Sequence, residues 1–292
     1  MDGKTICGII IVIILAGMFI PFGSSEKTGD NSVAVTYGET TYYNENYKSI
    51  VDNYFKSNSN ADLSNANQTI ITANDVNKIS ADISQRTYNS NQILSCAMVD
   101  LSSNNDINID VDKSKITTVT PSMYKSALKS SGITKGNVIV TSPTTATGES
   151  ALAGVMKSYE TATGKEIPED LKNAANKEIY AQSQVVNDTN ASADDVAELV
   201  EEVKNEVAKE NTTDHNTIIT IINNIASNNN IQISDNDINI LADSIQDTQE
   251  VKDQAVAYQS QISDYINSSE AQSIMGRIWN IINTFINNYT HN

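Results

Sequence analysis

The sequence predicts an α/β (α+β) N-terminal domain with a small mixed sheet and a βαβ unit, followed by an all-α helical region. An N-terminal transmembrane or signal helix is predicted to precede both. Short β-branched runs that suit buried strands occur before residue 165. Beyond it, apolar residues recur at helical spacing. The expected divisions are a signal peptide or anchor (1–25), a linker (26–32), an α/β domain (33–165) and a helical region (166–292).

The N-terminal prediction depends on residues 6–22, which run from Ile6 to Phe22 almost without a polar side chain. Seventeen residues of helix span roughly 25 Å, just short of a hydrocarbon core. Gly23 and Ser25 suit a cleavage site, but the run is longer than most signal-peptide cores. With Lys4 ahead of it, we expect a single-pass anchor in the cell membrane with the body outside. Secretion after cleavage is the alternative.

Charge and residue usage exclude several functions. The formal net charge is −17, so the chain lacks the basic surface that nucleic acids or anionic lipids require. Its two histidines, His215 and His291, suit neither a zinc site nor a catalytic triad, and we predict no metal and no cofactor. Cys7 lies in the apolar run, so a disulfide with Cys96 is not expected, and Cys96 is predicted to be a core residue.

Two buried strands and two helices are predicted before residue 102. The strands are residues 33–37 (VAVTY) and 93–101 (ILSCAMVDL). A helix between them places five apolar residues on one face, and a shorter helix at 75–84 has three inward residues. These are Tyr47, Ile50, Val51, Tyr54 and Phe55 in the first, and Val76, Ile79 and Ile83 in the second.

Residues 106–112 (DINIDVD) resemble a calcium-binding loop in the spacing of their polar residues. However, Val111 stands where such a loop needs glycine, and Thr117 stands where it needs glutamate. The strict alternation of apolar and polar residues instead predicts an edge strand with its apolar side inward.

A βαβ unit is predicted next. Thr120 and Pro121 suit a helix start, and Gly132 suits its end, with Tyr124, Ala127 and Leu128 inward. The flanking strands are expected near residues 116–119 and 138–140. Strands joined by a helical crossover should be parallel and right-handed in connection.

Helices account for everything after Pro168. One begins there, another at Ser192 with Asp195 as its capping partner, and a third at Ser234. Nine acids between residues 188 and 214 predict a solvated helix face, with cation binding or partner docking as the alternative. The last helix is expected to span 251–289, with Trp279 as a packing anchor. The inward residues are Leu171, Ala175, Ile179 and Val186; Val196, Leu199, Val200, Val203 and Val207; Ile218, Ile221, Ile222 and Ile225; Ile238, Leu241 and Ile245.

The Ser/Thr-rich loop between the strand at 138–140 and a helix that ends at Gly164 is the candidate ligand site. Loops at the carboxyl end of a strand commonly bind ligands in α/β proteins. The candidate residues are Thr141, Ser142, Thr144, Thr145, Thr147, Gly148 and Glu149. The structural alternative makes Thr147 the helix N-cap, and makes Gly148, Ala151 and Gly154 small residues for close packing.

The chain is rich in asparagine, which favours a solvated surface. Six asparagines also begin glycosylation sequons, which matter only if the body is exported in an organism that glycosylates it. They are Asn67, Asn187, Asn190, Asn211, Asn267 and Asn288.

Part of the sequence resembles a known family. The relevant segments are residues 120–128 (TPSMYKSAL), Gly132 with Ile133, 138–140 with Pro143, 148–154 (GESALAG) and 157–160 (KSYE). They are similar to the domain-of-unknown-function family one-thousand-and-two, exported proteins of bacteria and some archaea. The resemblance implies export and a common fold. The family has no established activity, so it assigns no catalytic residue.

We therefore expect a membrane-anchored extracytoplasmic protein that is a binding or structural component of the cell envelope. Its expected partners are the membrane, through the N-terminal helix, and an envelope glycan or protein. The alternative is a hydrolase of envelope polymers that uses Glu149 with an acid from the acidic helices. A sensor is disfavoured because only about five residues precede the membrane run.

Overall fold

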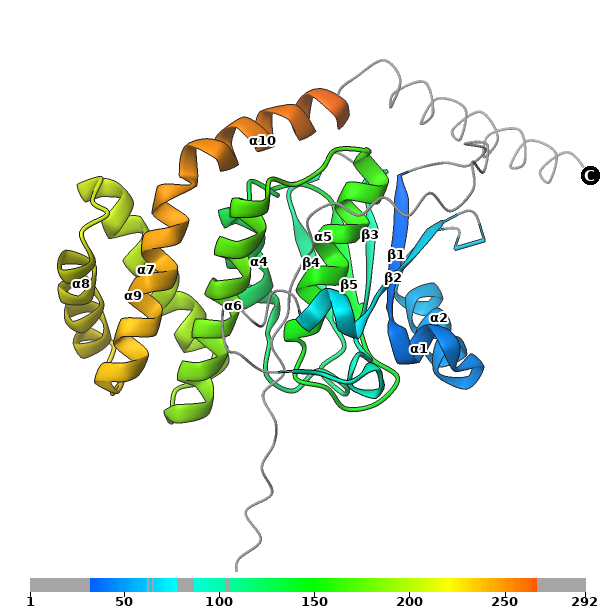
Figure 1. Ribbon diagram of the computed structural model, residues 1–292, viewed down its shortest axis with the longest axis horizontal. Helices are drawn as coiled ribbons and strands as arrows, with labels where there is room; N and C mark the ends of the chain where they lie inside the picture. Colours follow the sequence, from blue (N-terminus) through cyan, green and yellow to red (C-terminus); the bar gives the residue numbers. More distant parts are fainter. Residues whose placement is uncertain (1–31, 62, 65, 78–86, 103–104, 267–292) are drawn as a thin grey trace, which may run out of the picture.

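The computed structural model describes residues 32–61, 63–64, 66–77, 87–102 and 105–266 (Figure 1), and omits the side chains of residues 149–150 and 265–266. The predicted anchor at residues 6–22 lies outside these ranges, as do Ile79, Ile83 and Trp279. Within the described ranges, none of the helices has the length and apolar character needed to span a membrane.

The small mixed sheet that the sequence predicts is present and has five strands within the described ranges, one of which, β2, is not predicted from the sequence. Its strand order is β2-β1-β3-β5-β4. The outer pairs β1–β2 and β4–β5 are parallel, and β3 runs antiparallel to both β1 and β5. The strands are β1 (Val33–Gly38), β2 (Asn67–Ile71), β3 (Cys96–Asp100), β4 (Asn108–Val111) and β5 (Asn137–Thr141).

Helices cover both faces of this sheet. The side chains of Ala34, Val99 and Val140 pack into a core with α4 (Pro121–Ser130), α5 (Glu149–Thr163) and α6 (Glu169–Asp188). The alternate strand residues, such as Val35 and Met98, pack against α2 (Glu45–Asn58) on the other face. The short helix α1 (Glu39–Tyr43) links β1 to α2. This alternation follows from the two-residue period of a strand.

The predicted apolar face of α2 is only partly correct. Val51 and Phe55 are fully buried, but Ile50 is 46% exposed, and Tyr47 and Tyr54 are half-buried. On this side of the sheet α2 packs beside only the short α1, so one stripe of residues four apart meets the sheet. Tyr54 packs at the edge of the same cluster, whereas Ile50 faces outward.

The βαβ unit exists, but its first strand is β4 and not residues 116–119. That segment makes a single bridge, Ile116 to Ala146. The Thr117 amide donates to the Ala146 carbonyl (2.9 Å), and the Val119 amide donates to that of Thr147 (3.0 Å). The segment therefore binds the loop after β5 instead of joining the sheet. β4 lies at the sheet edge, as its alternating pattern predicts.

Up to residue 266, where the described part of the chain ends, four further helices follow α6: α7 (Ala193–Glu210), α8 (His215–Asn228), α9 (Asp235–Glu250) and α10 (Lys252–Ile266). The predicted starts are confirmed, because Pro168 precedes α6, Ser192 and Asp195 form a capping box, and Ser234 caps α9. In Figure 1, α7, α8 and α9 stack beside α6. From the end of α9, α10 runs back past α6 and α4 toward the sheet. Residues 267–289 of the predicted last helix lie outside the described ranges.

The helix α6 joins the sheet to the helices that follow. Leu171 and Ile179 pack with sheet residues, whereas Ala181 and Val185, one turn later, pack with α7, α8 and α9. Tyr258 and Ile262 of α10 also belong to the core beside the sheet. The division at residue 165 stays a prediction of a domain boundary.

Candidate functional site

The loop after β5 is mostly packed into the protein. Thr141, Ser142 and Gly148 are buried, Thr144 and Thr147 are half-buried, and Thr145 is exposed. Glu149 is the first residue of α5, and its side chain lies outside the described atoms. The predicted ligand residues therefore share one loop but do not all face one surface.

Hydroxyl groups near the carboxyl ends of β4 and β5 are used within the fold. The Thr141 Oγ1 donates to Asp112 Oδ2 at 2.7 Å. The other oxygen of Asp112 accepts from the amide (3.1 Å) and hydroxyl (2.6 Å) of Ser114. The hydroxyls of Ser142 and Thr147 are buried without a hydrogen-bond partner among the described atoms. The Thr141 hydroxyl is thus used within the fold, whereas those of Ser142 and Thr147 are not, and the ligand site in this loop stays a prediction.

Thr147 is not the N-cap of α5, which corrects the sequence prediction. Gly148 occupies that position, with φ of +106° and no side-chain cap. A Cβ at Gly148 would lie 2.5 Å from Ile116 Cγ2, so only glycine fits. The Gly148 carbonyl accepts a hydrogen bond from the Tyr124 hydroxyl. The close-packing hypothesis for Gly154 agrees with the structure, since a Cβ there would lie 3.4 Å from Ala97 Cβ.

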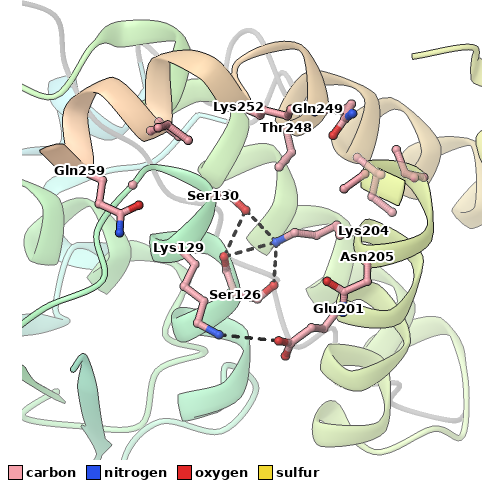
Figure 2. Close-up of a pocket in the computed structure, with 16 residues that line it drawn as sticks. Ser126, Lys129, Ser130, Glu201, Lys204, Asn205, Thr248, Gln249, Lys252 and Gln259 are labelled. Atoms are coloured by element: carbon pink, nitrogen blue, oxygen red, sulfur yellow. Dashed lines mark hydrogen bonds and ion pairs between the residues drawn. The ribbon is translucent and has the colours of Figure 1, made fainter. Parts of the chain in front are cut away.

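A cavity lies elsewhere, between α4, α7, α9 and α10 (Figure 2), with a volume of about 350 Å³. This is within the range of small-molecule sites. Its lining includes three lysines, one from each of α4, α7 and α10, together with serine, threonine and amide side chains. The charged or polar residues are Ser126, Lys129, Ser130, Glu201, Lys204, Asn205, Thr248, Gln249, Lys252 and Gln259.

A buried ion pair lies beside this cavity, with its lysine, Lys204, among the lining residues. Lys204 Nζ lies 3.0 Å from both carboxylate oxygens of Glu178, a residue of α6 that is 1% exposed. The hydroxyls of Ser126 and Ser130 donate to the same carboxylate at 2.5 and 2.7 Å. Gln182 Nε2 adds a contact of 3.3 Å. Glu178 thus has the paired, hydrogen-bonded surroundings that a buried carboxylate requires.

This arrangement favours binding over nucleophilic catalysis. Lys204 Nζ lies 2.7 Å from Ser130 Oγ and 3.0 Å from Ser126 Oγ, which resembles a serine–lysine pair. A lysine that acts as a base must accept the hydroxyl proton, but here both hydroxyls donate to Glu178 and Lys204 Nζ donates to them. The pair fixes a cation and two hydroxyls at the cavity wall.

The other two lysines of the cavity have weaker contacts. Lys129 Nζ lies 3.6 Å from Glu201 Oε1, with side chains that are 45% and 60% exposed. Exposed pairs of this kind stabilise a protein by at most about 1 kcal/mol. Lys252 Nζ donates to Asn211 Oδ1 at 3.0 Å. Both lysines can therefore turn toward a ligand at little cost.

These residues form no motif in the sequence, because they come from different helices. Lys204 and Ser126 are 78 positions apart. The available signal was the presence of polar residues at inward positions. Ser126 and Ser130 lie one turn apart on the buried side of α4, and Glu178 directly precedes the buried Ile179 of α6.

Among the described residues no group of three or more His, Cys, Asp or Glu side chains is placed to hold a metal ion. Of the sequons, Asn67 lies in β2, whereas Asn187, Asn190 and Asn211 are exposed near the ends of α6 and α7. Asn267 and Asn288 lie outside the described residues.

Comparison with known proteins places the chain in a family. It is 29% identical over 192 residues to Uncharacterized protein YpuA of Bacillus subtilis (strain 168), which is 60% of this chain and 64% of that protein. The chain therefore spans less than two thirds of that relative. No solved structure matches it. A family model described as Protein of unknown function (DUF1002) matches residues 37–265, and the chain belongs to this family.

Proposed function

We propose that this protein is a membrane-anchored, extracytoplasmic binding protein of the cell envelope, and that it takes a small polar ligand into the cavity between α4, α7, α9 and α10. The cavity carries the binding part of the proposal, because converging cationic and hydroxyl groups in an otherwise acidic chain form a specific site. The apolar run at residues 6–22 supports the anchor, and cleavage with secretion is the alternative.

A hydrolase of envelope polymers is the second candidate function. Glycosidases need two carboxyl groups about 5 to 10 Å apart across one cleft. Of the two carboxylates near the cavity, Glu178 lies behind two serines, and Glu201 is paired with Lys129. The carboxylates at the cavity thus support binding better than acid–base catalysis, and the predicted role of Glu149, whose side chain lies outside the described atoms, stays a prediction.

Export can be tested by cell fractionation and protease treatment. When cells stripped of their wall are fractionated, the chain should be found with the membranes. Protease added to such cells before lysis should digest the extracytoplasmic body. A cytoplasmic protein in the same sample should stay intact. Recovery of the whole chain in the soluble fraction of the lysed cells would refute the anchor.

The site can be tested with the full chain in mild detergent. Envelope extract should yield ligand with the wild type and with Thr145→Ala/Glu149→Ala, but not with Lys129→Gln/Lys252→Gln. The first double variant changes the loop after β5, and the second changes the cavity. The opposite pattern would move the binding site to the loop.

A further inference from the structure

We propose that the cavity between α4, α7, α9 and α10 binds a phosphate group carried by a small polar molecule. The inference rests on the proposed function, since it names the ligand class of the same site. Three lysines line the cavity, and Figure 2 shows the Lys204 side chain pointing between Ser126 and Ser130.

The charges at the cavity favour an anion. Lys129, Lys204 and Lys252 supply three positive charges, and Glu201 and Glu178 supply two negative ones, so the balance is 3 − 2 = +1. The whole chain carries −17. A local excess of positive charge within an acidic protein concentrates anions where the walls exclude water.

The contacts show how an anion would enter. Lys204 is fixed by Glu178 and the two serines, and its side chain is still 19% exposed. Lys129 has only the exposed contact to Glu201 to give up. Lys252, at the first position of α10, has a neutral partner in Asn211. An anion between them would gain hydrogen bonds from Lys129 and Lys252, which can rearrange, and the nearby charge of Lys204, whose N–H groups already meet Glu178 and the two serines.

Phosphate fits these groups better than a carboxylate does. A carboxylate is a flat fork that arginine matches with two parallel hydrogen bonds, whereas lysine binds as a point charge. Every cation that lines this cavity is a lysine. Three ammonium groups from three helices can approach the oxygens of a tetrahedral phosphate from different sides, and its charge near −2 exceeds that of a carboxylate.

The size of the cavity limits what carries the phosphate. A volume of about 350 Å³ lies at the low end for small-molecule sites. Asn205, Thr248 and Gln259 supply further neutral hydrogen-bonding groups at its wall. The ligand is therefore a small phosphate ester with hydroxyl groups, or the terminal group of a larger envelope molecule.

The test is calorimetric titration of the full chain in detergent at low salt. Glycerol 3-phosphate and inorganic phosphate are the phosphate probes, succinate is the carboxylate probe, and glycerol is the neutral one. Saturable binding of glycerol 3-phosphate is expected, weakened roughly tenfold in Lys129→Gln/Lys252→Gln and by added salt. The matched control is Lys56→Gln/Lys113→Gln, which removes the same charge from exposed positions that neither line the cavity nor adjoin a lining residue, and should change affinity less than twofold.

Three results would overturn the assignment: no saturable binding of either phosphate probe, equal weakening in both double variants, or binding of succinate in place of phosphate. Binding of glycerol 3-phosphate but not of inorganic phosphate supports an ester. The titration does not depend on where the protein resides. A failure of phosphate binding is thus separate from a failure of export or of ligand capture.

Discussion

Replacing Lys204 with methionine removes the ammonium group from the Glu178 ion pair and keeps the length of the side chain. Glu178 is 1% exposed, so the change leaves a buried carboxylate with only Ser126, Ser130 and Gln182 as donors. Removing one partner of a buried pair costs about 3 to 5 kcal/mol. Lys204 is 19% exposed and neutral donors remain, so we expect the lower value, a loss of about 3 kcal/mol in the free energy of unfolding.

Urea unfolding followed by circular dichroism measures this loss. Glu178→Gln/Lys204→Met removes both charges and should recover at least half of it, because no unpaired charge stays buried. Lys209→Met is the matched control on the same helix. It breaks a pair with Glu206 in which the lysine is 73% exposed, and should cost less than about 1 kcal/mol. If Lys204→Met were no worse than this control, the ion pair would not stabilise the fold as argued.

Three further predictions concern backbone, thiol and pH. Gly148→Ala should lower the melting temperature far more than Gly164→Ala. Both residues have positive φ, but of the two only Gly148 is crowded, with a methyl carbon 2.5 Å from the added Cβ. Equal effects of the two substitutions in thermal melts would contradict this. Burial raises the pKa of the Cys96 thiol to about 12. Peptide mass spectrometry should therefore find Cys96 unmodified by iodoacetamide in the native protein and modified in urea. If the native protein were alkylated as fast as the unfolded protein, the thiol would not be buried. Hydrogen bonds from the Thr217 side chain and amide hold the pKa of Asp214 below its ordinary value, so this cap stabilises the fold above the unfolded-state pKa and loses that effect as the pH falls through the folded-state pKa. Asp214→Asn keeps a hydrogen-bond acceptor but does not titrate, so its melting temperature should fall less in acid than that of the wild type. An identical fall would rule out this contribution.

The parts of the fold that the sequence predicts correctly have strong local signals. Thr120, Pro121 and Gly132 predict the limits of α4, because capping and a left-handed stop depend on neighbours in the chain. The apolar stripe of α7 is equally clear, since Val196 and Val207 are both buried. Such local signals do not predict which other helix or strand an element packs against.

The errors arise where tertiary contacts decide. Residues 116–119 look like a strand, but the loop after β5 supplies their hydrogen-bond partners. Thr147 is a good capping residue by type, yet Gly148 takes the N-cap because Ile116 leaves no space for a side chain. The cavity could not be predicted either, since Ser126, Glu178 and Lys204 meet only after three helices have packed.

Gly132 links the fold to the cavity. The sequence predicts it as the stop of α4, and its φ of +76° agrees. The structure adds a second requirement, because a Cβ there would lie 2.2 Å from the carbonyl oxygen of Ala255 in α10. Gly132 and Ala255 both line the cavity, and Ala255 is followed by Tyr258 in the core beside the sheet. The close contact between α10 and α4 at Gly132 therefore also brings Lys252 to the cavity. The glycine that ends α4 thus helps to position one of the three lysines that we propose bind phosphate.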